Sequence, residues 1–112
     1  MNLYQKYKEN NLVKVPLTAL AIGDILVLAV SAEYFVEYFL DIKRKLKDKW
    51  SNVYIFELSN GWVGYIPTKK AFSFKDGAYE VQFLESSKLC DDAGVLIEEE
   101  LLKMADKLFT NK

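Results

Sequence analysis

Histidine is absent from the sequence, and cysteine occurs once, as Cys90. Histidine is the commonest general base and the commonest metal ligand, and one cysteine forms neither an internal disulfide nor a thiolate cage. A Ser-His-Asp triad, a Cys-His dyad and a zinc finger are therefore excluded within one chain. No base lies near Cys90 in the sequence, so we expect it to be a small buried apolar residue.

The chain also lacks a dominant charge and long apolar runs. Its 15 basic and 16 acidic residues leave a formal net charge of −1, which provides no field to attract a phosphate backbone or an anionic membrane. No apolar run approaches the roughly 20 residues of a membrane-spanning helix, and the N-terminus has no apolar signal segment. We expect a cytoplasmic protein with no nucleic-acid partner and no transmembrane segment.

The composition is typical of one globular domain. The chain has 112 residues, of which 51% are hydrophobic and 28% charged, so it is long enough for one core and too short for two. Residues 1–12 are polar and unpatterned, which indicates an N-terminal arm. We expect residues 13–112 to form a single α/β domain.

The first half of that domain predicts a hairpin and then a helix. Apolar residues alternate from Leu12 to Ile22, Pro16 places the start of this strand at a sheet edge, and Gly23-Asp24 is typical of a tight turn. The run Ile25–Val30 is apolar at every position, as in a strand covered on both faces at the centre of a sheet. Ser31 is the expected N-cap of a helix that has Glu33 in its first turn and ends near Asp48. The buried face of this helix is predicted from its spacing: Tyr34, Phe35, Tyr38, Phe39, Ile42 and Leu46.

The second half predicts a parallel crossover and a final helix. The apolar run Val53–Leu58 reads as a strand parallel to the first buried strand, and 59–61 break it before a shaped loop at 62–68. Another strand is expected at Tyr79–Leu84. Asp91 or Asp92 is the expected cap of a last helix whose apolar stripe comprises Ile97, Leu101, Met104, Ala105 and Leu108. The predicted fold class is α/β, a mixed sheet with a β-hairpin, a βαβ crossover and a C-terminal helix packed on the sheet.

A candidate site follows from this topology. In an open α/β sheet the ligand crevice lies beyond the carboxyl ends of the parallel strands, where Glu33 and Tyr65 bring a carboxylate and a phenol. A structural interpretation is also open. An acid in the first turn of a helix is stabilised by the helix dipole, by roughly 0.3–1 kcal/mol, and a tyrosine is commonly a packed residue. Trp62 is interpreted as an anchor in the core or in an interface.

Several segments together resemble the neutral/alkaline non-lysosomal ceramidase family. They are LAIGDILV at 20–27, EYFVE at 33–37, NGWVGYIPTKKAF at 60–72, GAYEV at 77–81 and SSKL at 86–89. The resemblance covers about residues 13 to 109 and corresponds to the C-terminal portion of the catalytic domain. It implies a zinc-dependent amidase fold that hydrolyses the N-acyl bond of ceramide, a sphingolipid, or of a related amide.

The same resemblance assigns roles to three residues. In the family, two histidines, a glutamate and a tyrosine surround the zinc. The family's Pro-Gly-Glu motif corresponds to Ser31-Ala32-Glu33, and its Asn-Gly-aromatic-x-x-Tyr loop places the tyrosine at Tyr65. Glu33 and Tyr65 are therefore the expected metal ligands. Tyr79 corresponds to a later family tyrosine near the substrate and is the expected catalytic residue.

The chain departs from the family in what it lacks. The two histidines and the active-site serine come from an upstream part of the family domain, and catalytic zinc normally needs three protein ligands. We therefore expect the C-terminal part of a ceramidase-like zinc-dependent amidohydrolase that is not catalytically complete alone and holds zinc only if a partner chain completes the site. The alternatives are a non-catalytic binding or assembly module that retains the fold, and a metal-free enzyme using Glu33 as a lone acid/base.

A part of a larger sheet leaves apolar surface uncovered, and such patches usually bind a partner. We expect a homo-oligomer, or a complex with a complementary N-terminal hydrolase portion, and an amide or lipid as substrate.

Overall fold

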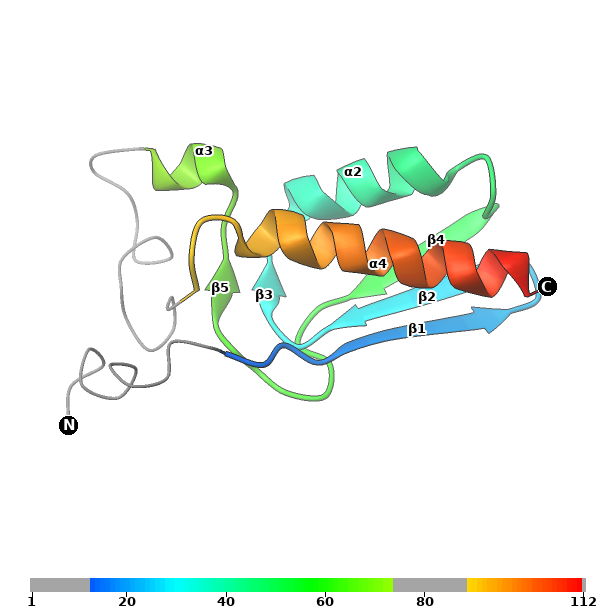
Figure 1. Cartoon of the computed structure of the whole chain (residues 1–112), viewed down its shortest axis with the longest axis horizontal. Helices are drawn as coiled ribbons and strands as arrows, with labels where there is room; N and C mark the ends of the chain where they lie inside the picture. Colours follow the sequence, from blue (N-terminus) through cyan, green and yellow to red (C-terminus); the bar gives the residue numbers. More distant parts are fainter. Residues whose placement is uncertain (1–12, 74–88, 112) are drawn as a thin grey trace.

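The computed structural model describes residues 13–73 and 89–111 as a two-layer α/β arrangement. One layer is a three-stranded sheet of β1 (Leu17–Ile22), β2 (Ile25–Val30) and β4 (Asn52–Phe56). The other layer consists of helices α2 (Val36–Leu46) and α4 (Ala93–Thr110), which pack on the sheet and on each other (Figure 1). Two short strands, β3 (Glu33–Tyr34) and β5 (Tyr65–Ile66), form a second sheet, and a short helix α3 (Lys69–Phe72) follows. The predicted fold class is confirmed.

Strand β2 lies at the centre of the three-stranded sheet, as its uniformly apolar sequence predicts. It runs antiparallel to β1, with Ile22 opposite Ile25 across the Gly23-Asp24 turn, and parallel to β4. Gly23 has a φ of 58°, a left-handed conformation that glycine adopts without steric cost. Strand β1 begins at Leu17 rather than Leu12, because Pro16 has no N–H with which to continue a ladder.

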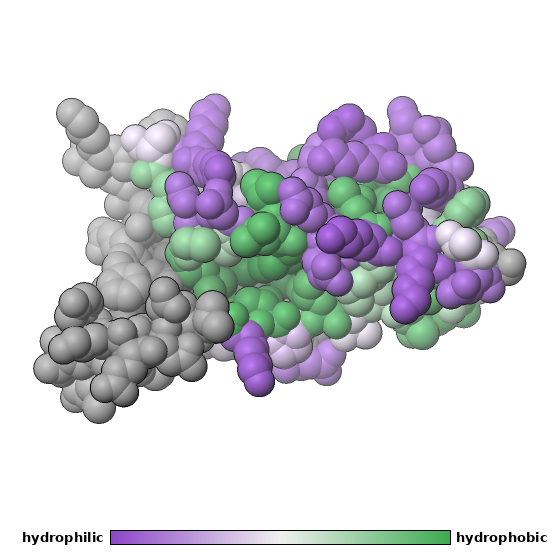
Figure 2. All heavy atoms as spheres, viewed as in Figure 1, coloured by the Kyte–Doolittle hydropathy of each residue, from purple (hydrophilic) through white to green (hydrophobic). Residues whose placement is uncertain are grey.

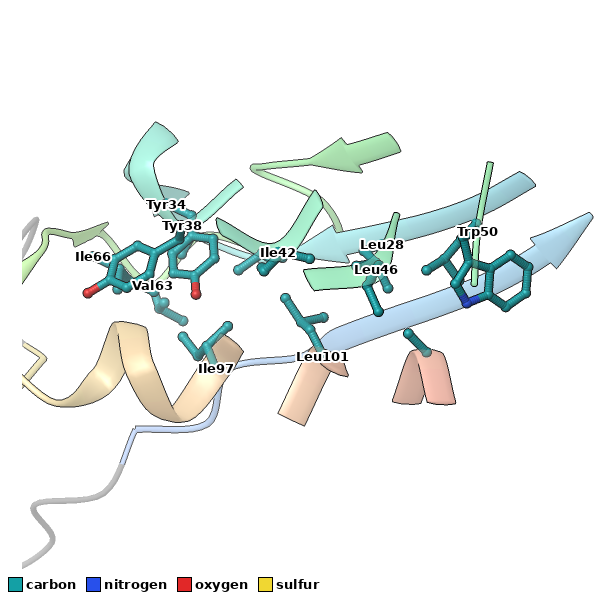
Figure 3. Close-up of a cluster of buried hydrophobic side chains, with 14 residues drawn as sticks. Leu28, Tyr34, Tyr38, Ile42, Leu46, Trp50, Val63, Ile66, Ile97 and Leu101 are labelled. Carbon is teal, nitrogen blue, oxygen red and sulfur yellow. The ribbon is translucent and has the colours of Figure 1, made fainter. Parts of the chain in front are cut away.

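The core fills the space between the sheet and the two helices. Leu26, Leu28 and Val30 of β2 are fully buried, and they face the α2 and α4 stripes that the helical spacing predicts (Figure 3). The buried members of those stripes are Tyr38, Ile42, Leu46, Ile97, Leu101 and Ala105. Trp50 closes one end of this core, and Tyr34, Tyr38 and Ile66 close the other.

Two expectations at the start of α2 are wrong. Glu33 lies in strand β3 rather than in the first turn of a helix, and α2 begins only at Val36 after Phe35. Ser31 caps no helix, since its hydroxyl donates to the Pro16 carbonyl at 3.0 Å. The reason is tertiary pairing: the N–H of Glu33 donates to the Gly64 carbonyl at 2.9 Å, and this bond holds the segment extended.

Residues 13–73 and 89–111 cover β2 on one face only, whereas its sequence predicts cover on both. The helices cover only one side of the sheet, and the register of the three strands places nine residues on the other side. In three cross-strand rows they are Thr18, Ala29 and Phe56, then Leu20, Val27 and Tyr54, then Ile22, Ile25 and Asn52. We call these nine residues the open sheet face. Most of them are exposed, and the rest are half-buried.

Some local features differ from expectation or were not anticipated. Cys90 is exposed rather than buried, β5 lies within the segment that was expected to be a loop, and α3 follows that segment. Helix α3 forms because the Thr68 hydroxyl accepts a hydrogen bond from the Ala71 N–H at 3.2 Å, a capping interaction. Asp92 is the N-cap of α4, as predicted.

The expected strand Tyr79–Leu84 and the arm at 1–12 lie outside the described residues. Among the helices that the structure describes, none is long and apolar enough to cross a membrane.

Candidate functional site

The structure brings Glu33 and Tyr65 together. They are direct Cα partners in the parallel pair β3–β5, although 31 residues separate them in the sequence. Their strand neighbours Tyr34 and Ile66 are buried in the core. Because successive side chains of a strand point to opposite sides, the half-buried Glu33 and Tyr65 project together from the side away from that core. A carboxylate and a phenol thus lie side by side, as the sheet argument predicted.

The loop between β4 and β5 creates this pairing. After β4, the N–H of Ser59 donates to the Val30 carbonyl at 3.0 Å, and the chain then leaves the sheet and returns, so that the N–H of Val63 donates to the Ser31 carbonyl at 2.9 Å. Such a tight excursion needs left-handed backbone: φ is 56° at Leu58, 63° at Asn60, 144° at Gly61 and 105° at Gly64. The Asn-Gly-x-x-Gly pattern supplies residues suited to three of these four positions.

Trp62, at the tip of this loop, orients the Glu33 carboxylate. Its indole N–H donates to Glu33 Oε2 at 2.9 Å, and the side chain is 48% exposed, so of the two expected roles, an anchor in the core or in an interface, the structure excludes the first. A hydrogen bond to one carboxylate oxygen fixes the rotamer of the carboxylate and leaves its other oxygen to face a ligand. The sequence shows that the indole is a donor, but it does not identify Glu33 as the acceptor.

The donors that the described residues bring together at this pair are too few for a catalytic zinc ion. Glu33 and Tyr65 contribute two oxygen ligands, whereas catalytic zinc takes three protein ligands. Within residues 13–73 and 89–111, no group of three His, Cys, Asp or Glu side chains is placed to hold a metal. Tyr79 lies outside these residues. Glu33 precedes α2 by three residues, so it does not lie in the first turn of that helix.

A second polar cluster links the two helices. Lys45 Nζ of α2 lies 2.8 Å from Asp41 Oδ2 and 3.3 Å from Glu98 Oε2 of α4. Burial, and then the adjacent Asp41 carboxyl, raise the pKa of Glu98. Hydrogen bonds from Lys45 and Arg44 hold the pKa of Asp41 well below its usual range. Glu98 is nearly inaccessible to solvent, so the cluster connects the two helices and does not present the Glu98 carboxylate to a substrate.

A separate surface cavity of about 280 Å³ lies at the start of β4. It is lined by Lys43, Lys47 and residues 50–54. None of the predicted site residues contributes to it, so it has no part in the Glu33–Tyr65 site.

Fold and site together define a two-layer α/β protein with a mixed sheet and a carboxylate–phenol pair on two adjacent parallel strands. The sequence matches no protein-family model, and neither a curated protein nor a solved structure is significantly similar to it.

Proposed function

We propose that this chain is the C-terminal part of a ceramidase-like zinc-dependent amidohydrolase and that a second chain completes its site. The observation that carries the proposal is the pairing of Glu33 with Tyr65, two residues that the family resemblance names as metal ligands. Their side chains share one side of β3–β5, and the Trp62 indole orients the carboxylate. In this proposal the protein is cytoplasmic and its substrate is an amide or lipid.

The division of work between the chains follows from the donor count. Glu33 and Tyr65 would hold one side of a zinc ion, and histidines of the partner chain would supply the remaining ligands, since this chain has none. When bound, zinc supplies Lewis acidity and a nucleophilic water near neutral pH. The role of this chain is to position two oxygen ligands, and no chemical step is assigned to it alone. Tyr79 keeps its proposed place near the substrate.

A zinc titration followed by two-dimensional NMR tests this proposal. Zinc at the second oxygen of Glu33 withdraws charge from the carboxylate that accepts the indole hydrogen bond, so we expect the Trp62 indole resonance to shift at about millimolar zinc. The indole resonance of Trp50, which lies at the far end of the core, is the internal reference. Glu33→Gln and Tyr65→Phe should weaken the response about tenfold, because each removes one of two ligands. Glu37→Gln, an exposed acid on α2, is the matched control and should leave it unchanged. An equal response in Glu33→Gln and the wild type would contradict the proposal.

The second candidate is a non-catalytic binding or assembly module. The observation that favours it is the open sheet face, an apolar surface without catalytic groups. In that case Glu33→Gln and Tyr65→Phe would leave both zinc response and partner binding unchanged. The bond from Trp62 to Glu33 would then serve only to hold the loop on β3.

A further inference from the structure

We infer that the open sheet face is the interface of a homodimer, in which the three-stranded sheets of two copies pack face to face. This inference concerns a surface other than the Glu33–Tyr65 pair and does not depend on the proposed hydrolase function. It rests on the composition of the face, its area and the sequence of β2.

The composition of the open sheet face suits contact with the same face of a second copy of the chain. None of the nine residues is charged, and the two polar residues without a ring, Thr18 and Asn52, occupy opposite corners of the three-by-three array. In a two-fold interface the same patch meets itself, so a charged patch would bring like charges together. A charge-free face whose polar groups lie at its rim avoids this repulsion. It also offers no charge by which a different partner would be selected.

The area of the face matches what a stable dimer needs. Leu20, Ile22, Ile25, Tyr54 and Phe56 are 51%, 58%, 36%, 48% and 53% exposed. At about 150–250 Å² for each large side chain when fully exposed, they present roughly 400–600 Å² of apolar surface. One side of a standard interface is about 800 Å², of which about 65% is apolar in homodimers, or about 520 Å². The surface therefore has the size of a complete interface and lies at the upper end of what monomers leave exposed.

The sequence of β2 points the same way. All six residues of this strand are apolar, and Leu26, Leu28 and Val30 alone are buried by the helices of the same chain. A strand with one side in water normally carries polar residues at the alternate positions. Ile25, Val27 and Ala29 occupy those positions instead. Two such sheets pack about 10 Å apart with their strands about 30° from parallel, as in a β-sandwich.

Analytical ultracentrifugation of the whole chain over about 1–200 µM tests this inference. We expect the wild type to be dimeric, and Leu20→Glu to raise the dimer dissociation constant about 100-fold or more, because an isologous interface contains the buried charge twice. Tyr54→Glu, on a different strand of the same face, should do the same. The matched control is Leu40→Glu on α2, whose side chain is 63% exposed outside the face, and it should leave the dimer intact. Circular dichroism establishes that each variant is folded.

Three results would overturn the inference. They are a wild type that is monomeric at every concentration, folded Leu20→Glu and Tyr54→Glu variants that remain dimeric, and a Leu40→Glu variant that dissociates as fully as Leu20→Glu. A monomeric wild type would assign the face to a different polypeptide. Leu20→Glu retains Glu33, Trp62 and Tyr65, so its zinc response is measured independently of its association state.

Discussion

Gly94 of α4 packs directly against the Tyr38 ring of α2, and Gly94→Ala should destabilise the fold. A Cβ at residue 94 would overlap the end of the Tyr38 ring. That ring is held in place: it stacks on Tyr34 with 4.5 Å between centroids, and its hydroxyl donates to the Pro67 carbonyl at 3.1 Å. The Tyr34 hydroxyl in turn donates to the carbonyl of Gly94 itself at 2.7 Å. The new methyl group therefore cannot be accommodated by moving one unconstrained side chain.

The magnitude follows from these contacts. Overpacking a buried site costs about 1–3 kcal/mol, and displacing Tyr38 instead would lose a hydrogen bond of about 1 kcal/mol and an aromatic contact of about 0.5–1.5 kcal/mol. Alanine is a better helix former than glycine, which offsets up to about 1 kcal/mol. We expect a net loss of about 1 kcal/mol in the free energy of unfolding, measured by urea titration with tryptophan fluorescence as the signal.

A double-mutant cycle separates the steric cause from the helix propensity. In a Tyr38→Ala background the ring is absent, so Gly94→Ala should become neutral or stabilising by up to about 1 kcal/mol. If Gly94→Ala has the same effect in both backgrounds, the close packing of Tyr38 on Gly94 is refuted. If it stabilises the wild type, the helices have room that the structure does not show.

The remaining predictions concern the buried acid and the site loop. The pKa of Glu98 is raised above its unfolded value of about 4.5, so the protonated carboxyl favours folding. This contribution to the free energy of unfolding is fully present below pH 4.5 and is lost as the pH rises through the pKa of the folded state. The free energy of unfolding of Glu98→Gln, measured in urea, should therefore equal that of the wild type near pH 4.5 and exceed it by about 1 kcal/mol near pH 8, because the uncharged amide still donates a hydrogen bond to Asp41. A less stable variant near pH 8 would show that the Glu98 carboxylate is net favourable. Gly64→Ala, at a φ of 105°, should cost about 1–3 kcal/mol in thermal unfolding, whereas Gly23→Asn, at a φ of 58° with open space around it, should cost less than about 0.5 kcal/mol. Equal costs would mean that the loop is not constrained at Gly64.

The hairpin, the central strand and both long helices are predictable from sequence because their signals are local. Gly23-Asp24 fixes the turn, and the spacing of Ile97, Leu101 and Ala105 fixes the buried stripe of α4. The start of α2 is not predictable in this way. Ser31 and Glu33 carry an ordinary capping signal, and a hydrogen bond from a loop thirty residues later holds them extended.

The candidate site shows the same limit. Topology was sufficient to bring Glu33 and Tyr65 to one edge, because both follow parallel strands. The role of Trp62 depends on a loop conformation with left-handed residues on both sides of Trp62. Composition alone does not determine that conformation. An uncovered apolar surface was expected, but its position was not, because the uniformly apolar sequence of β2 predicts cover on both faces of the strand.

The uncovered sheet has a consequence for how the protein folds. Contacts of β1 with β2 and of β2 with β4 join segments close in sequence, whereas α4 contacts β1 from the far end of the described chain. Short loops close at lower entropic cost, so we expect the sheet to assemble before α4 docks on it. In that interval both faces of the sheet would be apolar, with only α2 to shield one of them. We therefore expect aggregation to compete with folding until α4 docks.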